Sequence, residues 1–362
     1  MYKKYSKQRK ILNTDIMLDE RLLKEEFGET SFLGSYNSEH SNNSFFISLD
    51  KLNMENPIKR LGSGGVGSVY QTLWNGMIVA VKVFDLNDIQ ITEDDFMIEA
   101  SLLSKLRHPN VINFFGISSS PTKRYIIMEC LEKSLDRVVS DLQRENCRYT
   151  LEEKLTVLSN IGNGIEYLHT MTPKRIAHRD LKPGNILLDS NGVCKLCDFG
   201  LSKMMSQHTL SALTNQVGTC YYMSPEVSDV HEVDSTLATA LDIYSFAIIM
   251  WQILFEVVDP YMSTDVKVLK KLGLKEPPHY QSMFHLHRCI SESGTRPSIP
   301  FTSMEGCLEW CETYLPNQSK QTYQVLFEMC ELIKQCWDQS PQQRPSIQTI
   351  IQHLNNWAKC LQ

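Results

Sequence analysis

The sequence has little that would place the chain in or across a membrane. Its most apolar window, Ile243–Val258, is interrupted by Gln252 and Glu256 and is too short to span a bilayer. The basic start, Met1–Lys4, is not followed by the apolar run of a secretory signal, so we expect none. We therefore predict a buried core helix at 243–258, no membrane span, and a cytoplasmic location.

An excess of positive charge and a cysteine framework are also missing. The 36 Lys and Arg residues are outnumbered by 42 Asp and Glu residues, for a net charge of −6, so we expect no nucleic-acid partner. The 11 cysteines are odd in number and irregularly spaced, which is typical of free thiols in a reducing compartment. The CxxC at Cys194–Cys197 lies in an apolar run without a second pair at zinc spacing, so it predicts a β-strand.

No internal repeat divides the chain, whose 362 residues can form one large domain or two ordinary ones. Residues 1–45 are polar and include a Ser- and Asn-rich run at Ser35–Ser44. This composition predicts a flexible N-terminal extension, and regular structure is expected to begin near Phe45.

A glycine-rich segment, Gly62–Gly67, has the spacing GxGxxG. The spacing alone does not distinguish a Rossmann turn from other phosphate-binding loops. A Rossmann unit would start a helix directly after the glycines, whereas here β-rich segments follow at Val69–Gln71 and Met77–Phe84, with a turn at Asn75-Gly76. The order predicts a flap between two strands, whose backbone N–H groups close over phosphates.

A lysine within the second of these strands needs a negatively charged partner. Lys82 shares its face of the strand with apolar neighbours, because alternate residues point to the same side. In the helical segment that follows, Glu99 falls on the apolar stripe, where a carboxylate must be paired. Thr92, with Asp95 after it, predicts the start of that helix through a capping box. We therefore predict an ion pair between Lys82 and Glu99.

The stretch Ala177–Asn185 brings a carboxylate, two cations and an amide into one loop. Asp180 can accept a proton, and Lys182 can neutralise charge that develops beside it. Asn185 offers an amide oxygen to a hard cation such as Mg²⁺, and a further carboxylate follows in Asp198-Phe199-Gly200. These residue types predict proton transfer beside a metal-bound, negatively charged group.

The elements around this loop are mostly helical in pattern. Leu151–His169 predicts a long helix that leads into the loop, and Glu129–Leu131 predicts a short connector before it. Two strands are expected between the Glu99 helix and this connector, at Val111–Ile117 and Tyr125–Met128.

Taken in order, these motifs resemble those of the eukaryotic protein kinases over roughly residues 50–358. Asp242–Phe246 and Cys336–Asp338 are similar to the tyrosine-kinase-like (TKL) group, whose members are mostly serine/threonine-specific. The resemblance implies an α+β fold of two lobes, a small antiparallel β-sheet lobe with one helix and a larger, mainly helical lobe. The expected protein kinase domain is 46–358, with the small lobe at 46–128, the hinge at 129–133 and the large lobe at 134–358.

The resemblance also implies ATP and Mg²⁺ as ligands and a role for each motif residue. Lys82 would hold the phosphates of ATP and pair with Glu99, while Asp180 would be the catalytic base, with Lys182 beside it. Asn185 and Asp198 would bind Mg²⁺. The residues expected to contact the nucleotide are Leu61, Gly62, Ser63, Gly64, Gly65, Val66, Gly67, Val69, Ala80, Lys82, Met128, Glu129, Leu131, Asn185, Leu187 and Asp198.

The substrate implied by the resemblance is a serine or threonine hydroxyl of a protein. Lys182 after Asp180 resembles the serine/threonine pattern, and Thr219 matches the threonine of the substrate-binding loop, where its hydroxyl would contact Asp180 and Lys182. A dual-specificity kinase and a pseudokinase scaffold remain alternatives. A pseudokinase is disfavoured because the chain retains the residues that pseudokinases commonly lose, which are Lys82, Asp180, Asn185 and Asp198.

Regulation by phosphorylation is expected at the segment after Asp-Phe-Gly. Arg179 is suited to bind a phosphate, and the segment carries the hydroxyl residues Ser202, Ser206, Thr209, Ser211 and Thr214. Thr214 is the expected regulatory site because of its distance from Glu226, and its phosphorylation would come from an upstream kinase or in trans from a second copy.

The resemblance makes two structural predictions in the large lobe. Glu226 and Arg344 should form a buried ion pair. The segment from about Phe301 to Gln324, before Val325–Trp337, is longer than is usual in the family and is expected to be a surface insertion.

Overall fold

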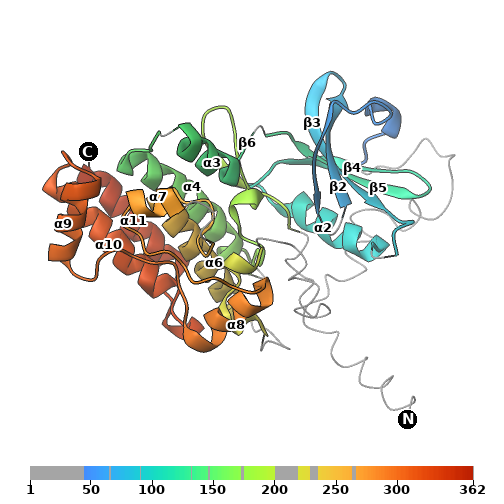
Figure 1. Ribbon diagram of the computed structural model, residues 1–362. Coiled ribbons are helices and arrows are strands. Elements are labelled where there is room, and N and C mark those ends of the chain that lie inside the picture. The colour runs from blue at the N-terminus through green and yellow to red at the C-terminus, as the bar shows by residue number, and fades with distance from the viewer. Residues whose placement is uncertain are drawn as a thin grey trace, which may run out of the picture. The chain divides into compact units, whose positions relative to one another are not determined.

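The computed structural model describes residues 45–64, 67–89, 91–131, 133–145, 147–172, 175–199, 219–228, 235–262 and 266–361 (Figure 1). These residues divide into two compact units. Unit 1 covers residues 45–105 and Phe114–Glu129, and unit 2 covers Leu106–Asn113 and the described residues from Cys130 onward. The change from unit 1 to unit 2 after Glu129 falls within the hinge expected at 129–133.

Unit 1 is built on a five-stranded antiparallel sheet with the order β1-β2-β3-β5-β4 (Figure 1). The strands are β1 (Lys59–Gly64), β2 (Gly67–Trp74), β3 (Met77–Asp85), β4 (Phe114–Ser119) and β5 (Lys123–Glu129). Asn75 and Gly76 have positive φ angles of 48° and 85°, which a tight β2–β3 hairpin requires. The antiparallel sheet and the hairpin turn expected from the sequence are confirmed.

One helix, α2 (Glu93–Lys105), packs against the sheet of unit 1. It starts at the expected capping box, because Asp95 accepts a hydrogen bond from the Thr92 backbone N–H at 2.9 Å and its own N–H donates to the Thr92 hydroxyl at 3.2 Å. Its apolar stripe is buried at Phe96 and Leu103, and Phe96 lies edge-on against Phe84 of β3. The helix therefore covers the sheet face that carries Lys82.

The opposite face of the sheet is covered by residues 45–54. Val79, Val81 and Val83 point to this face and form a buried cluster with Ile47 and Leu52. The sequence predicted order from Phe45 onward but did not predict this packing.

Unit 2 is mainly helical, as the α+β two-lobed fold predicts. Its helices are α3 (Leu135–Glu145), α4 (Leu151–Thr170), α6 (Ser235–Phe255), α7 (Val266–Lys271), α8 (Met283–Ser293), α9 (Met304–Tyr314), α10 (Lys320–Cys336) and α11 (Ile347–Leu361). A small sheet of β6 (Lys133–Ser134), β7 (Ile186–Leu188) and β8 (Cys194–Leu196) completes it. The strand expected at the CxxC is therefore confirmed, and burial raises the pKa of the Cys194 thiol to about 12.

Helix α6 is the central helix of unit 2 and packs against α4 and α10 (Figure 1). Its segment Leu237–Phe255 is long and apolar enough to cross a membrane by length and composition alone, but 83% of that window is buried inside the fold. Just after α6, the carboxylate of Glu256 forms an ion pair with the buried ammonium of Lys154 at 3.0 Å. The buried core helix predicted at 243–258 is thus confirmed up to Phe255, but it begins earlier, and its apolar segment is longer than the window that was judged too short to span a bilayer.

Residues Leu106–Asn113 group with unit 2, although the sequence placed them in the small lobe and began a strand at Val111. The physical reason is their bonding to β8. The Ile112 N–H donates to the Leu196 carbonyl at 2.9 Å, and the Leu196 N–H donates to the Asn110 carbonyl at 2.9 Å. Strand β4 consequently begins only at Phe114.

The segment Phe301–Gln324, which was expected to be a surface insertion, is mostly exposed or half-buried. It contains helix α9, which packs against α10 and buries Cys307, Trp310 and Cys311. The Trp310 indole N–H donates to the Leu272 carbonyl at 2.8 Å. The three buried residues have i, i+3 and i+4 spacing, which marks a helix face that must be covered.

Candidate active site

Lys82 and Glu99 form the ion pair that the sequence predicted. The Lys82 ammonium lies 2.7 Å and 2.8 Å from the two carboxylate oxygens of Glu99, and both residues are buried, 6% and 1% exposed. β3 supplies the lysine and α2 the glutamate, so the pair fixes the helix against the sheet.

The other unit 1 residues expected to contact the nucleotide lie on neighbouring strands. Leu61, Gly62 and Gly64 lie in β1, Gly67 and Val69 in β2, Ala80 in β3, and Met128 and Glu129 in β5. Gly67 has φ 117°, and a Cβ there would lie 2.4 Å from the Val83 carbonyl oxygen, so only glycine fits. Ala80 and Met128 are direct cross-strand partners and are both buried. Gly65, Val66 and the side chain of Ser63 lie outside the described part of the chain.

In unit 2, only one of the two carboxylate oxygens of Asp180 accepts hydrogen bonds from the described residues. Its Oδ2 accepts a hydrogen bond from the Lys182 ammonium at 2.7 Å and from the Asn185 side-chain amide at 2.8 Å. Its Oδ1 is buried and has no hydrogen-bond partner among the described residues. A buried, unbonded carboxylate oxygen beside a fixed cation is suited to accept a proton from a bound hydroxyl.

The loop around Asp180 is anchored by Asp242 of α6, a residue whose role the sequence did not reveal. Its buried carboxylate accepts hydrogen bonds from the backbone N–H groups of His178 and Arg179, each at 2.8 Å. One of its oxygens also lies 2.8 Å from Nε2 of the His169 ring. Burial alone would raise the pKa of Asp242, but the hydrogen bond and charge of His169, with the charge of His178 and the Arg179 N–H, lower it. Asp242 thus stays ionised and fixes the backbone directly before Asp180.

Arg179 takes the left-handed backbone conformation, with φ 65°, at the turn into the loop. The Nε of its guanidinium is buried and has no partner among the described residues. Burial lowers the pKa of this group, while the charge of Asp242 acts in the opposite direction. A half-buried guanidinium with an unbonded nitrogen is suited to bind an anion.

The residues expected to bind Mg²⁺ fit a hard cation by their chemistry. Both hydrogen bonds of the Asn185 side chain go through its nitrogen, to the Asp180 carbonyl and carboxylate, which leaves its oxygen as a ligand. Asp198 is exposed, with φ 62°, directly before the buried Phe199, whose ring centroid lies 4.9 Å from that of His178. Asn185 ends a 3-10 turn at Pro183–Asn185.

The remaining expected site residues lie elsewhere in unit 2 or outside the described residues. Leu187 lies in β7, and Leu131 is partly buried after the end of β5. Thr214 and the other hydroxyl residues at 202–211 lie outside the described residues, as does the side chain of Thr219.

The predicted ion pair between Glu226 and Arg344 is confirmed. Two guanidinium nitrogens of Arg344 lie 2.6 Å and 2.7 Å from the two carboxylate oxygens of Glu226. The arginine side chain is 1% exposed and the glutamate side chain 13%.

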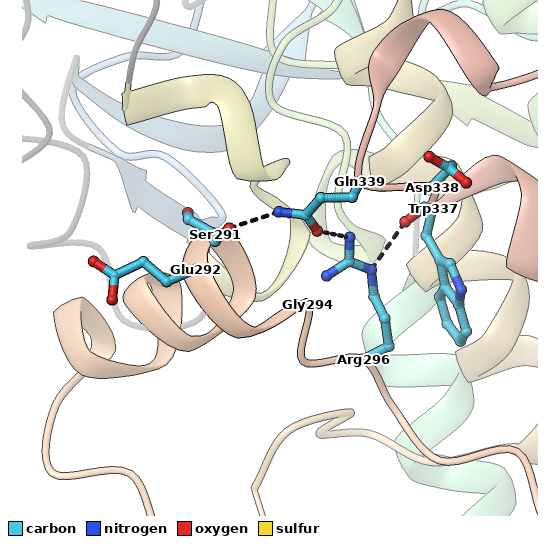
Figure 2. A pocket seen from close by; sticks show the side chains of 7 residues that line it. All are labelled: Ser291, Glu292, Gly294, Arg296, Trp337, Asp338 and Gln339. Atoms are coloured by element: carbon cyan, nitrogen blue, oxygen red, sulfur yellow. Dashed lines mark hydrogen bonds between the residues drawn. The ribbon is translucent and has the colours of Figure 1, made fainter.

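A pocket at the end of α8 does not add to the candidate site (Figure 2). Its polar groups bond to one another: Arg296 donates to the Trp337 carbonyl and to the Gln339 side chain, and Gln339 donates to the Ser291 carbonyl. These bonds tie α8 to the chain after α10, and we interpret the pocket as a structural junction.

Comparisons with known proteins identify a family to which this chain is similar. A family model described as "Protein kinase domain" matches residues 56–355. The chain is 31% identical over 297 residues to dual specificity protein kinase shkB of Dictyostelium discoideum, covering 80% of this chain and 38% of that protein. It is 34% identical over 199 residues to serine/threonine-protein kinase CTR1 of Arabidopsis thaliana, covering 54% of this chain and 23% of that protein. The chain therefore spans less than half the length of either relative.

Proposed function

Because the chain belongs to the protein kinase family, we propose that it is a serine/threonine protein kinase, which transfers the γ-phosphoryl group of ATP to hydroxyl groups of proteins. A protein kinase domain implies ATP as a substrate, typically with Mg²⁺, and implies protein substrates. The observation that carries the proposal is the Asp180 carboxylate, which is bonded on one oxygen and unbonded on the other.

The charged and amide side chains of the candidate site have distinct roles in the proposed reaction. Asp180 accepts the proton of the substrate hydroxyl, and Lys182 fixes that carboxylate and offsets negative charge that develops beside it. Lys82, held by Glu99, binds phosphate oxygens. Asn185 and Asp198 would hold Mg²⁺, which neutralises charge on the phosphates when bound.

Two alternatives make different predictions for the same experiment. The purified chain is incubated with γ-labelled ATP, Mg²⁺ and a generic protein substrate, and the labelled amino acids are then separated. We expect label on phosphoserine and phosphothreonine. Additional phosphotyrosine would indicate the dual specificity that the name of the relative shkB states for that protein. No transfer above an Asp180→Asn control would indicate a pseudokinase scaffold.

A cytoplasmic location is part of the proposal. All 11 cysteines of the sequence are free thiols in the structure, which supports a reducing compartment. Immunofluorescence of the expressed protein would test it, and a signal confined to the secretory pathway would contradict it.

We also propose that phosphorylated Thr214 activates the enzyme by binding Arg179. The half-buried Arg179, whose Nε is buried and unbonded among the described residues, supports this role, because a phosphate would satisfy its guanidinium with charge-assisted hydrogen bonds. Phosphatase treatment of active enzyme, or Thr214→Ala, should lower kcat by about tenfold or more, the equivalent of one charge-assisted hydrogen bond.

The control for this switch is Ser206→Ala, which removes another hydroxyl of the same segment and should leave kcat unchanged. Mass spectrometry identifies the phosphorylated residues before treatment. A rate that survives both the phosphatase and Thr214→Ala would show that the segment is not the switch.

A further inference from the structure

Residues 45–54 join the fold of unit 1 although they lie outside the kinase match at 56–355. The Ile47 N–H donates to the Ile117 carbonyl at 2.8 Å, and the Ile117 N–H donates to the Phe45 carbonyl at 2.9 Å. Through these bonds the segment pairs with the edge strand β4 in the parallel direction. Farther along, the Asn53 N–H donates to the Leu73 carbonyl of β2 at 3.0 Å. The segment thus crosses the sheet from one strand to another.

Phe45 occupies a defined position at the start of this segment. Its ring centroid lies 5.6 Å from that of Phe114, within the range of aromatic pairs. A Cβ at position 116 would lie 2.3 Å from the Phe45 carbonyl oxygen, so the close approach of the segment to β4 requires Gly116. The neighbouring Phe46 is 44% exposed and contributes only its backbone to the pairing.

Phe114 connects Phe45 to the residues expected to line the nucleotide. Phe114 is the cross-strand partner of Met128, and Met128 is the partner of Ala80, so the three residues form one row across the sheet. All three are buried. β4 also packs against α2, the helix that carries Glu99. A displacement of Phe114 would therefore move Met128, its partner in the row. It would also move α2, whose Glu99 pairs with Lys82.

We propose that Phe45 is a positioning residue for ATP binding, acting through Phe114. It fixes the first residue of β4, which in turn sets the position of Met128 and of α2. The inference rests on the proposed function, because it takes Met128, Ala80 and Lys82 to be nucleotide contacts. A purely structural role for the segment would instead affect only the stability of unit 1.

Three variants of the full chain separate these two roles. Phe45→Ala removes the ring that contacts Phe114, and Phe46→Ala removes a neighbouring exposed ring. Ile47→Ala removes buried apolar volume from the same segment without touching the aromatic pair. For each variant we would measure the Kd of a fluorescent ATP analogue, the KM for ATP, kcat and Tm.

We expect Phe45→Ala to raise the Kd and KM for ATP by about 2–10-fold, the equivalent of one aromatic pair, and Phe45→Leu to recover part of the loss. Phe46→Ala should change nothing, and Ile47→Ala should lower Tm while leaving the Kd unchanged below the unfolding transition. The inference is overturned if Phe45→Ala leaves Kd unchanged, or if Ile47→Ala raises Kd as much. Because analogue binding is measured without turnover, a chain that binds the analogue but transfers no phosphate would contradict the proposed function and still test Phe45.

Discussion

Asp180→Asn is expected to lower kcat by roughly 10²–10⁴-fold, the usual contribution of a general base. The substitution keeps the size of the side chain and an oxygen that can accept the hydrogen bonds of Lys182 and Asn185. It removes the negative charge that would take the proton of the substrate hydroxyl. The KM for ATP should change little, because Asp180 is not among the residues expected to contact the nucleotide.

The matched control is Asp189→Asn in the turn between β7 and β8. Asp189 also accepts two hydrogen bonds, from the backbone N–H groups of Asn191 and Val193 at 2.8 Å and 2.9 Å, but has no expected role in the reaction. Its replacement should leave kcat unchanged, because an Asn side chain accepts the same bonds. Equal losses in the two variants, or a near-normal rate for Asp180→Asn, would rule out the proposed base.

The features predicted correctly from the sequence depend on local spacing. The Lys82–Glu99 pair followed from the alternation of a strand, the stripe of a helix and the cost of an unpaired buried charge. The hairpin at Asn75-Gly76 and the Thr92 capping box each followed from a few adjacent residues. The strand alternation, the helix stripe, the hairpin and the capping box can be recognised because the geometry of each is set within a few neighbouring residues.

The features that the sequence did not reveal depend on contacts between distant segments. Asp242 holds the loop before Asp180 from far along the chain, and no spacing rule connects the two. Residues 45–54 show neither helical nor strand periodicity, because Ile47 and Leu52 are buried at irregular positions along a segment that crosses the sheet. Helix α9 was not predicted for a different reason: its apolar spacing was visible, but only the length of the segment was considered.

The largest expected loss of stability is at Arg344. Its guanidinium binds both carboxylate oxygens of Glu226, donates to the Ala240 and Asp338 carbonyls at 2.9 Å and 3.0 Å, and lies over the Tyr244 ring. Arg344→Met removes the cation and leaves a part-buried carboxylate unpaired. We expect it to lower the free energy of unfolding by about 3–5 kcal/mol, measured by urea denaturation followed by tryptophan fluorescence.

Two further variants determine whether the loss comes from the stranded charge. Arg288→Met breaks an exposed pair with Glu292, whose side chains are 65% and 62% exposed, and should cost at most about 1 kcal/mol. The double variant Glu226→Leu/Arg344→Met leaves no unpaired carboxylate, so it should be more stable than Arg344→Met alone, because two apolar side chains replace a buried ion pair. If the double variant is instead no more stable than Arg344→Met alone, Arg344 stabilises unit 2 through its bonds to the backbone carbonyls rather than through the neutralisation of Glu226.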